Sequence, residues 1–120
     1  MGKKILVVDD EPQLLRMLKT RLAANGYDVV TAEDGTSGLE RWQTEKPDLI
    51  LLDIMMPQMD GYTFIQESKG RSDLNPVPII IITAREGMED LFQMEGINDY
   101  IVKPFNDADL LKKIRKHLKN

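Results

Sequence analysis

The chain has 120 residues, of which 42% are hydrophobic and 30% charged, a size and balance typical of one folded domain with its own core. This balance excludes intrinsic disorder, and apolar runs of only four or five residues are too short to cross a membrane, so we expect no membrane association and a cytoplasmic location. The net charge of −4 disfavours direct nucleic-acid binding, and the absence of cysteine with a single histidine excludes thiol chemistry and His-rich metal clusters.

Short apolar runs alternate with amphipathic stretches along the chain. Residues 5–8, 49–52 and 79–82 are apolar at every position, as expected of strands that are buried on both faces. Weaker runs at 27–31 and 100–102 fit the edges of a sheet. The pattern predicts five parallel strands separated by helices.

Helical periodicity is clearest near the two ends of the chain. The first helix is expected to begin near Pro12 and to stop at Asn25–Gly26. The last helix, over residues 110–118, has Asn106 or Asp107 as its N-terminal cap and a run of basic residues that suits its C-terminal dipole.

Three shorter segments also have helical character. Apolar stripes follow Gly35 and Gly61, and a helix of eight residues at most fits between Gly87 and Gly96. At ~1.5 Å per residue such a helix is only about 12 Å long. Because so short a helix has little stability of its own, we expect residues 84–96 to be the most mobile part of the domain.

Parallel strands joined by right-handed helical crossovers form an open α/β sheet with helices on both faces. For five strands the commonest doubly wound order is 2-1-3-4-5, the flavodoxin-like arrangement, and we expect residues 1–120 to form a single domain of this type. Ligands of such sheets bind beyond the carboxyl ends of the strands, here between the first and third strands.

Three carboxylates are expected at that point. Asp9 and Asp10 follow the first strand and Asp53 ends the third. Any one of them could simply cap a helix, but three converging like charges favour a divalent cation. With oxygen ligands alone, Mg²⁺ is the natural candidate. The loop after the first strand lacks the glycine patterns that cradle a nucleotide phosphate.

A hydroxyl and a cation follow the last two strands. Thr83 ends the fourth strand and Lys103 ends the fifth, so both point to the same rim of the sheet as the carboxylates. Lys103 taken alone could be an ordinary surface lysine. Together with a metal and a carboxylate nucleophile, however, these groups are the parts needed for phosphoryl transfer to Asp53.

Four fragments of the sequence carry a family resemblance. Taken in order, they resemble a response-regulator receiver domain of two-component signalling, and the match covers essentially residues 3 to 119. The fragments are ILVVDDEP (residues 5–12), PDLILLDIMMP (47–57) followed by Asp60-Gly61, ITA (82–84) and DYIVKPF (99–105).

The resemblance implies a function and a set of ligands. Asp53 would accept a phosphoryl group from a phosphohistidine of a sensor histidine kinase or phosphotransfer protein, in a domain that promotes its own phosphorylation and dephosphorylation without being a conventional enzyme. Asp10 and Asp53 would bind Mg²⁺ directly and Asp9 largely through water. The backbone carbonyl of Met55 would add a further ligand.

The resemblance also implies a switch. Thr83 and Lys103 would bond phosphoryl oxygens, and the ring of Tyr100 would turn inward with Thr83. An unknown downstream effector would read the change on the face made by the short helix, the fifth strand and the last helix. A phosphorylation-dependent homodimer could form there through Asp99 and basic residues of the last helix. The family further implies a cis peptide bond between Lys103 and Pro104.

Two other functions stay open. The first is a Mg²⁺-dependent hydrolase with an aspartyl-phosphate intermediate on a related sheet, but such enzymes have a second aspartate two residues after the nucleophile, where this chain has Met55. The second is an interaction module that is never phosphorylated, which predicts the loss of a site residue, and none is lost. The cognate kinase, the output, the phosphoryl lifetime and whether the chain stands alone or belongs to a longer protein are not determined by the sequence.

Overall fold

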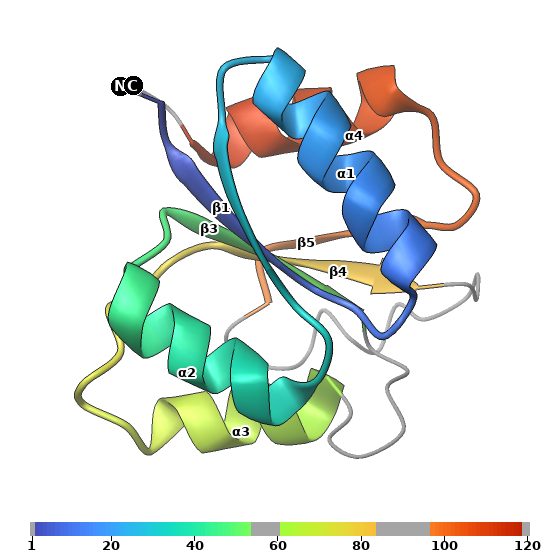
Figure 1. The fold of residues 1–120 in the computed structure, drawn as a ribbon. Coiled ribbons are helices and arrows are strands. Elements are labelled where there is room, and N and C mark those ends of the chain that lie inside the picture. The colour runs from blue at the N-terminus through green and yellow to red at the C-terminus, as the bar shows by residue number, and fades with distance from the viewer. Residues whose placement is uncertain (1, 54–60, 84–96, 119–120) are drawn as a thin grey trace.

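The computed structural model describes residues 2–53, 61–83 and 97–118, whose course is shown in Figure 1. Its centre is a five-stranded sheet in the order β2-β1-β3-β4-β5, and every neighbouring pair of strands is parallel. The predicted doubly wound order is therefore confirmed. The strands are β1 (Lys4–Val8), β2 (Asp28–Ala32), β3 (Leu49–Asp53), β4 (Ile79–Thr83) and β5 (Asp99–Val102).

Burial separates the central strands from the edges as the sequence predicted. All residues of β3 and β4 are buried, whereas β2 and β5 contain half-buried positions. The edge strands begin at Asp28 and Asp99, one residue away from the predicted starts. Both strands begin with an aspartate, which hides the boundary in the pattern of apolar residues. Asp28 is exposed, whereas Asp99 is buried and accepts hydrogen bonds from Lys113 and the Tyr100 N–H.

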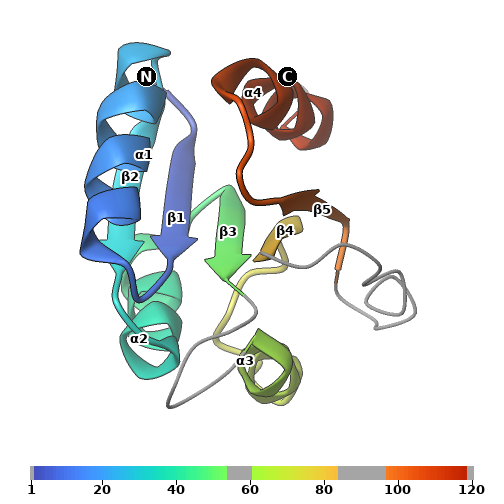
Figure 2. The same cartoon turned by 90° about the vertical axis from the view of Figure 1, so that its right-hand side faces the viewer.

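Among the described residues, two helices cover each face of the sheet (Figure 2). On one face α1 (Pro12–Ala24) and α4 (Asp107–His117) bury their leucines and isoleucine against the strands. On the other face α2 (Gly35–Glu45) and α3 (Gly61–Lys69) do the same with Leu39, Trp42, Phe64 and Ile65. The described helices therefore cover both faces of the sheet, as the sequence predicted.

The helix ends follow the predicted signals. Pro12 occupies the first turn of α1, Asn25 is its C-cap, and Gly26 adopts a φ of 90° that a residue with a side chain rarely takes. Asn106, one of the two predicted caps of the last helix, accepts a 2.7 Å hydrogen bond from the backbone N–H of Asp109.

Two predictions fall outside the described residues: the short helix and high mobility expected within residues 84–96, and the ligand role of Met55. Within the described ranges, no helix is both long and apolar enough to cross a membrane.

Candidate functional site

The three predicted carboxylates converge at the carboxyl ends of β1 and β3. Val8 is paired with Leu52, so Asp9 and Asp53 follow side by side on the two central strands. One carboxylate oxygen from each of Asp9, Asp10 and Asp53 lies within 4.8 Å of the others. The strand order thus brings together residues that are more than forty positions apart in the sequence.

These carboxylates differ in exposure. Asp9 is fully buried, Asp53 is 5% exposed, and Asp10 is exposed to solvent. Burial raises the pKa of Asp9, although the backbone N–H of Glu11 and the ammonium of Lys103 act in the opposite direction. Keeping Asp9 charged in this place is therefore unfavourable unless further positive charge is present.

The donor set fits a hard cation. All three side chains offer carboxylate oxygens, and oxygen ligands are those that Mg²⁺ and similar ions prefer. The exposed Asp10 leaves one side open to water, which Mg²⁺ commonly retains. This acidic cluster could therefore hold a metal ion.

Lys103 reaches the acidic cluster from β5. Its Nζ lies 3.3 Å from Oδ2 of Asp9 and 3.0 Å from Oε1 of Glu11. Burial lowers the pKa of Lys103, but the hydrogen bond to Glu11 and the charges of Asp9 and Asp53 outweigh burial, so the pKa is raised above its ordinary value. The side chain is therefore a permanent cation next to the carboxylates.

The backbone at the end of β5 directs this lysine. The Lys103 N–H donates a 2.7 Å hydrogen bond to the carbonyl of Thr83, which ties the ends of β4 and β5 together. The Lys103–Pro104 peptide bond is cis, as predicted from the family resemblance.

Thr83 and Tyr100 lie on the same face of the sheet. Tyr100 is paired with Ile81 and Val102 with Thr83, and side chains alternate between faces along a strand. Tyr100 packs against the core cluster on the side of α2 and α3, and Thr83 is fully buried. The two side chains are diagonal neighbours across β4 and β5, the arrangement that the switch hypothesis requires.

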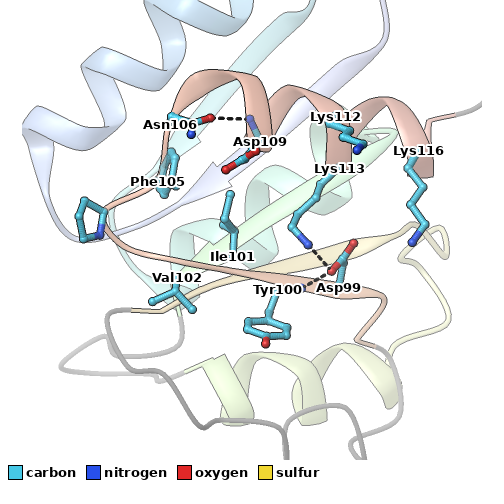
Figure 3. A pocket seen from close by; sticks show the side chains of 11 residues that line it. Asp99, Tyr100, Ile101, Val102, Phe105, Asn106, Asp109, Lys112, Lys113 and Lys116 are labelled. Carbon is cyan, nitrogen blue, oxygen red and sulfur yellow. Dashed lines mark hydrogen bonds and ion pairs between the residues drawn. The ribbon is translucent and has the colours of Figure 1, made fainter.

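A second charged cluster lies between β5 and α4 (Figure 3). Asp99 accepts a 3.0 Å hydrogen bond from Nζ of Lys113, and its other oxygen lies 3.0 Å from Nε2 of His117. The backbone N–H of Tyr100 also donates to Asp99, at 2.8 Å. Asp99 and Lys113, considered from sequence as partners across a dimer, are thus already paired within one chain.

Sequence reasoning missed the role of two residues. Glu11 contacts Lys103 across 92 positions of sequence, and nothing local to the acidic loop indicates that contact. His117 was used only to exclude metal clusters, although its position four residues after Lys113 places both on one face of the helix and was a usable signal.

An apolar groove adjoins the acidic cluster. Its volume is about 380 Å³, and Glu11 and Lys103 line it together with Leu14, Met17, Pro104 and Phe105. It runs between α1 and the segment that follows β5.

Comparison with known proteins places this geometry in a family. The family model described as the response regulator receiver domain matches residues 5–115. A probable transcriptional regulator of Cyanophora paradoxa is 48% identical over 119 residues, which cover 98% of this chain and 48% of that protein. The alkaline phosphatase synthesis transcriptional regulatory protein of Bacillus subtilis (strain 168) is 39% identical over 121 residues, with 99% and 50% covered. The chain spans about half the length of the curated relatives it matches.

Solved structures agree. A chemotaxis protein of Vibrio cholerae superposes with a TM-score of 0.90 at 32% identity and covers 98% of this chain and 100% of that one. The receiver domain of a sensor histidine kinase from Pseudomonas aeruginosa PAO1, described with a magnesium ion coordinated in its active site cleft, has a TM-score of 0.88 at 31% identity with full coverage of both chains. The BeF3-activated receiver domain of RstA from Klebsiella pneumoniae gives 0.85 at 35% identity, with 98% and 99% covered.

Proposed function

This chain belongs to the response regulator receiver domain family of two-component signalling, and from that premise we propose that Asp53 is the residue that accepts the phosphoryl group. The observation that carries the proposal is the convergence of carboxylate oxygens from Asp9, Asp10 and Asp53 within 4.8 Å, next to the ammonium of Lys103. Asp53 is the member of this group that ends a central strand with its side chain almost buried. Residues 1–120 act as a single receiver domain in this proposal.

The transfer step uses the Asp53 carboxylate as the nucleophile. An oxygen of Asp53 forms a bond to phosphorus while the bond from phosphorus to the donor's histidine nitrogen breaks, and the electron pair stays on that nitrogen, which takes up a proton. Lys103 stabilises the negative charge on the equatorial phosphoryl oxygens. Water later attacks the phosphorus, which releases inorganic phosphate and restores Asp53. The family is a signalling family, and in this proposal the chain promotes phosphorylation and dephosphorylation of its own side chain without being a conventional enzyme.

Mg²⁺ is the proposed cation. Asp10 and Asp53 would hold it directly, Asp9 would act largely through water, and the carbonyl of Met55 would complete the protein ligands. When bound, Mg²⁺ supplies positive charge that offsets both the crowded carboxylates and the incoming phosphoryl group. The unfavourable burial of charge on Asp9 supports this assignment.

Thr83 and Tyr100 form the proposed switch. Thr83 donates a hydrogen bond to a phosphoryl oxygen once Asp53 is modified, and the ring of Tyr100 moves into the space that Thr83 leaves. Their position on the same face of β4 and β5 supports such coupled motion. The change is a shift between populations, so the active arrangement is already sampled without phosphate.

The groove beside Lys103 is the proposed docking place of the phosphoryl donor, a sensor histidine kinase or phosphotransfer protein in the cytoplasm. A protein that carries phosphohistidine must bring that side chain to Asp53, and the groove leads to the site from α1. Its half-buried apolar residues Leu14, Met17 and Phe105 suit the apolar face of a partner helix. Met17→Glu should slow labelling by a phosphohistidine protein that labels the wild type, and should leave labelling by a small phosphoryl donor unchanged.

The output surface is proposed at β5 and α4. Exposed Asp109, Lys112 and Lys116 line a hollow there of about 570 Å³ (Figure 3), and acids and bases on one face suit a symmetric, self-complementary contact. A phosphorylation-dependent homodimer, or an effector of unknown identity in its place, would use this face. A monomer in sedimentation both with and without a phosphoryl mimic would exclude the dimer while leaving the switch intact.

Intact mass spectrometry tests the main proposal. After incubation with a small phosphoryl donor and Mg²⁺, the wild type should gain one phosphate mass, and the gain should disappear with chelator and in Asp53→Asn. Full labelling of Asp53→Asn would refute the assignment. Sustained turnover of a small phosphate ester by the wild type would instead favour the hydrolase alternative.

A further inference from the structure

Glu11 makes an ion pair that its position does not explain. It is the N-cap residue of α1, where side chains normally accept hydrogen bonds from the first turn, yet its side chain makes no such bond. Instead Oε1 lies 3.0 Å from Nζ of Lys103, although the Glu11 side chain is 61% exposed. The carboxylate therefore leaves the helix end and reaches across to β5.

Lys103 is held from two sides. Asp9 contacts it at 3.3 Å from the buried side and Glu11 at 3.0 Å from the solvent side. Asp9 belongs to the acidic cluster and stays near the reacting carboxylate. Glu11 pairs with the same ammonium without belonging to the cluster, so Lys103 is tied to a carboxylate on the solvent side as well as to Asp9.

We propose that Glu11 is a positioning residue that holds Lys103 in a resting place, from which a phosphoryl group on Asp53 must detach it. The inference rests on the proposed role of Asp53. It adds a residue outside the metal cluster that sets how readily the site accepts phosphate. A contact that must be broken on activation opposes activation by the free energy of that contact.

The size of the effect follows from the exposure of the pair. A partly exposed ion pair of this kind changes an equilibrium constant by about two- to fivefold. Removing the contact should strengthen binding of a phosphoryl mimic by that factor. The domain should fold equally well, since Glu11 contributes no cap bond and its side chain is largely in solvent.

Two substitutions distinguish the effect of the Glu11–Lys103 contact from the effect of the negative charge of Glu11. Glu11→Gln removes the charge and keeps the shape. Glu11→Asp keeps the charge, but a shorter aspartate at an N-cap bonds the first turn of the helix and cannot also hold Lys103. Glu33→Gln is the matched control, because Glu33 is an exposed acid that follows β2 at the same rim, and Lys103 pairs with Asp9 and Glu11 rather than with it.

The experiment titrates each variant of the 120-residue chain with beryllofluoride at saturating Mg²⁺ and follows the amide and lysine side-chain signals by NMR. Glu11→Gln and Glu11→Asp should each bind beryllofluoride about two- to fivefold more tightly than the wild type. Glu33→Gln should change the affinity by less than about 1.5-fold, since an exposed charge that is not paired with Lys103 is largely screened by solvent and salt. Without beryllofluoride, the Lys103 ε-methylene signals should shift in both Glu11 variants and stay in place in Glu33→Gln.

Several outcomes overturn the inference. Equal or weaker binding by Glu11→Gln would show that Glu11 does not oppose activation, and an equal gain in Glu33→Gln would show a general effect of charge. If Glu11→Gln binds beryllofluoride more tightly but Glu11→Asp binds it like the wild type, the contact between Glu11 and Lys103 is not what opposes binding, and the inference fails. In each of these cases the wild type still binds the mimic and the role of Asp53 stands. A wild type that binds no beryllofluoride and gains no phosphate would overturn both.

Discussion

Asp9 and Asp99 are both buried aspartates paired with a lysine, yet their carboxyl groups respond to the protein in opposite ways. Burial raises the pKa of Asp9, and its contacts with Glu11 and Lys103 do not compensate. Burial also acts to raise the pKa of Asp99, but hydrogen bonds from His117, Lys113 and the Tyr100 N–H outweigh it, so the pKa is lowered. One aspartate is stabilised as an anion and the other is not.

The difference separates a candidate metal site from a structural ion-pair cluster. At the rim, the ammonium of Lys103 pairs with two carboxylates, Asp9 and Glu11, and Asp9 belongs to a cluster that also contains Asp10 and Asp53. Between β5 and α4, one carboxylate has two basic partners. A site that is short of positive charge is ready to take up a cation, whereas a balanced cluster ties an edge strand to a helix.

The largest expected effect is a loss of Mg²⁺ affinity when aspartates of the acidic cluster are replaced. Asp9→Asn combined with Asp10→Asn should lower Mg²⁺ affinity by more than about 100-fold, because even partners outside the ligand shell cost about 10–100-fold. The free energy of unfolding without metal should change by less than about 1 kcal/mol, since crowded like charges are relieved. Isothermal titration and urea unfolding measure the two quantities. A sharp fall in stability would make these aspartates structural and erase the contrast with Asp99.

Asp99→Asn should behave in the opposite way. It weakens hydrogen bonds to two basic groups, and bonds to charged groups contribute about 1.5–3 kcal/mol, so unfolding free energy should fall by roughly that amount. Mg²⁺ affinity should stay within about twofold. Asp28→Asn is the matched control, because Asp28 begins the other edge strand and is exposed, and it should cost less than about 0.5 kcal/mol. Equal costs at both positions would show that the cluster contributes nothing.

The pH dependence of stability gives a finer test of the same cluster. The folded-state pKa of Asp99 is lowered, so its stabilisation is fully present above the ordinary aspartate pKa and is lost as the pH falls through that value towards the lowered one. The difference in unfolding free energy between wild type and Asp99→Asn should therefore be largest near neutral pH and shrink below about pH 4. A constant difference from pH 7 to pH 3 would contradict the assignment.

The sequence was sufficient to predict the fold because its local signals agree. Wholly apolar runs mark β1, β3 and β4, and Pro12 and Gly26 mark the ends of the first helix and its turn. The same pattern predicted which strands lie at the edges. Local propensity does not define where an edge strand starts, so β2 and β5 begin one residue from the predicted positions.

The site could be predicted only in part. Residues that follow central strands must meet at one rim, and this rule alone brought Asp9, Asp10 and Asp53 together. Contacts made by long flexible side chains obey no such rule, which is why the pairing of Lys103 with Glu11 was missed. Lys113 was among the basic residues expected to pair with Asp99, but whether they pair within one chain or between two depends on side-chain reach, and the second partner, His117, was missed.

The smallest expected effect concerns a third ion pair, which lies on the surface. Nη1 of Arg21 in α1 lies 2.7 Å from Oδ1 of Asp107 in α4, and both side chains are nearly half exposed. Despite its short distance, such a pair should contribute only about 0.2–1 kcal/mol, because solvent screens it and two flexible side chains are ordered. Its contribution to the free energy of unfolding is therefore the reference value with which the contribution of the Asp99 cluster is compared.

A double-mutant cycle isolates this pair. Asp107 also lies in the first turn of α4, where an acidic residue favours the helix by about 0.3–1 kcal/mol, so Asp107→Asn alone should cost more than Arg21→Gln alone. The coupling between the two changes removes that contribution and should itself fall when salt is raised to 1 M, as the Debye length drops to about 3 Å. The coupling free energy could instead be as large as the loss of unfolding free energy in Asp99→Asn. That result would mean that a short distance, rather than burial and multiple donors, determines the strength of these ion pairs. The contrast between the clusters would then have to be explained by geometry alone.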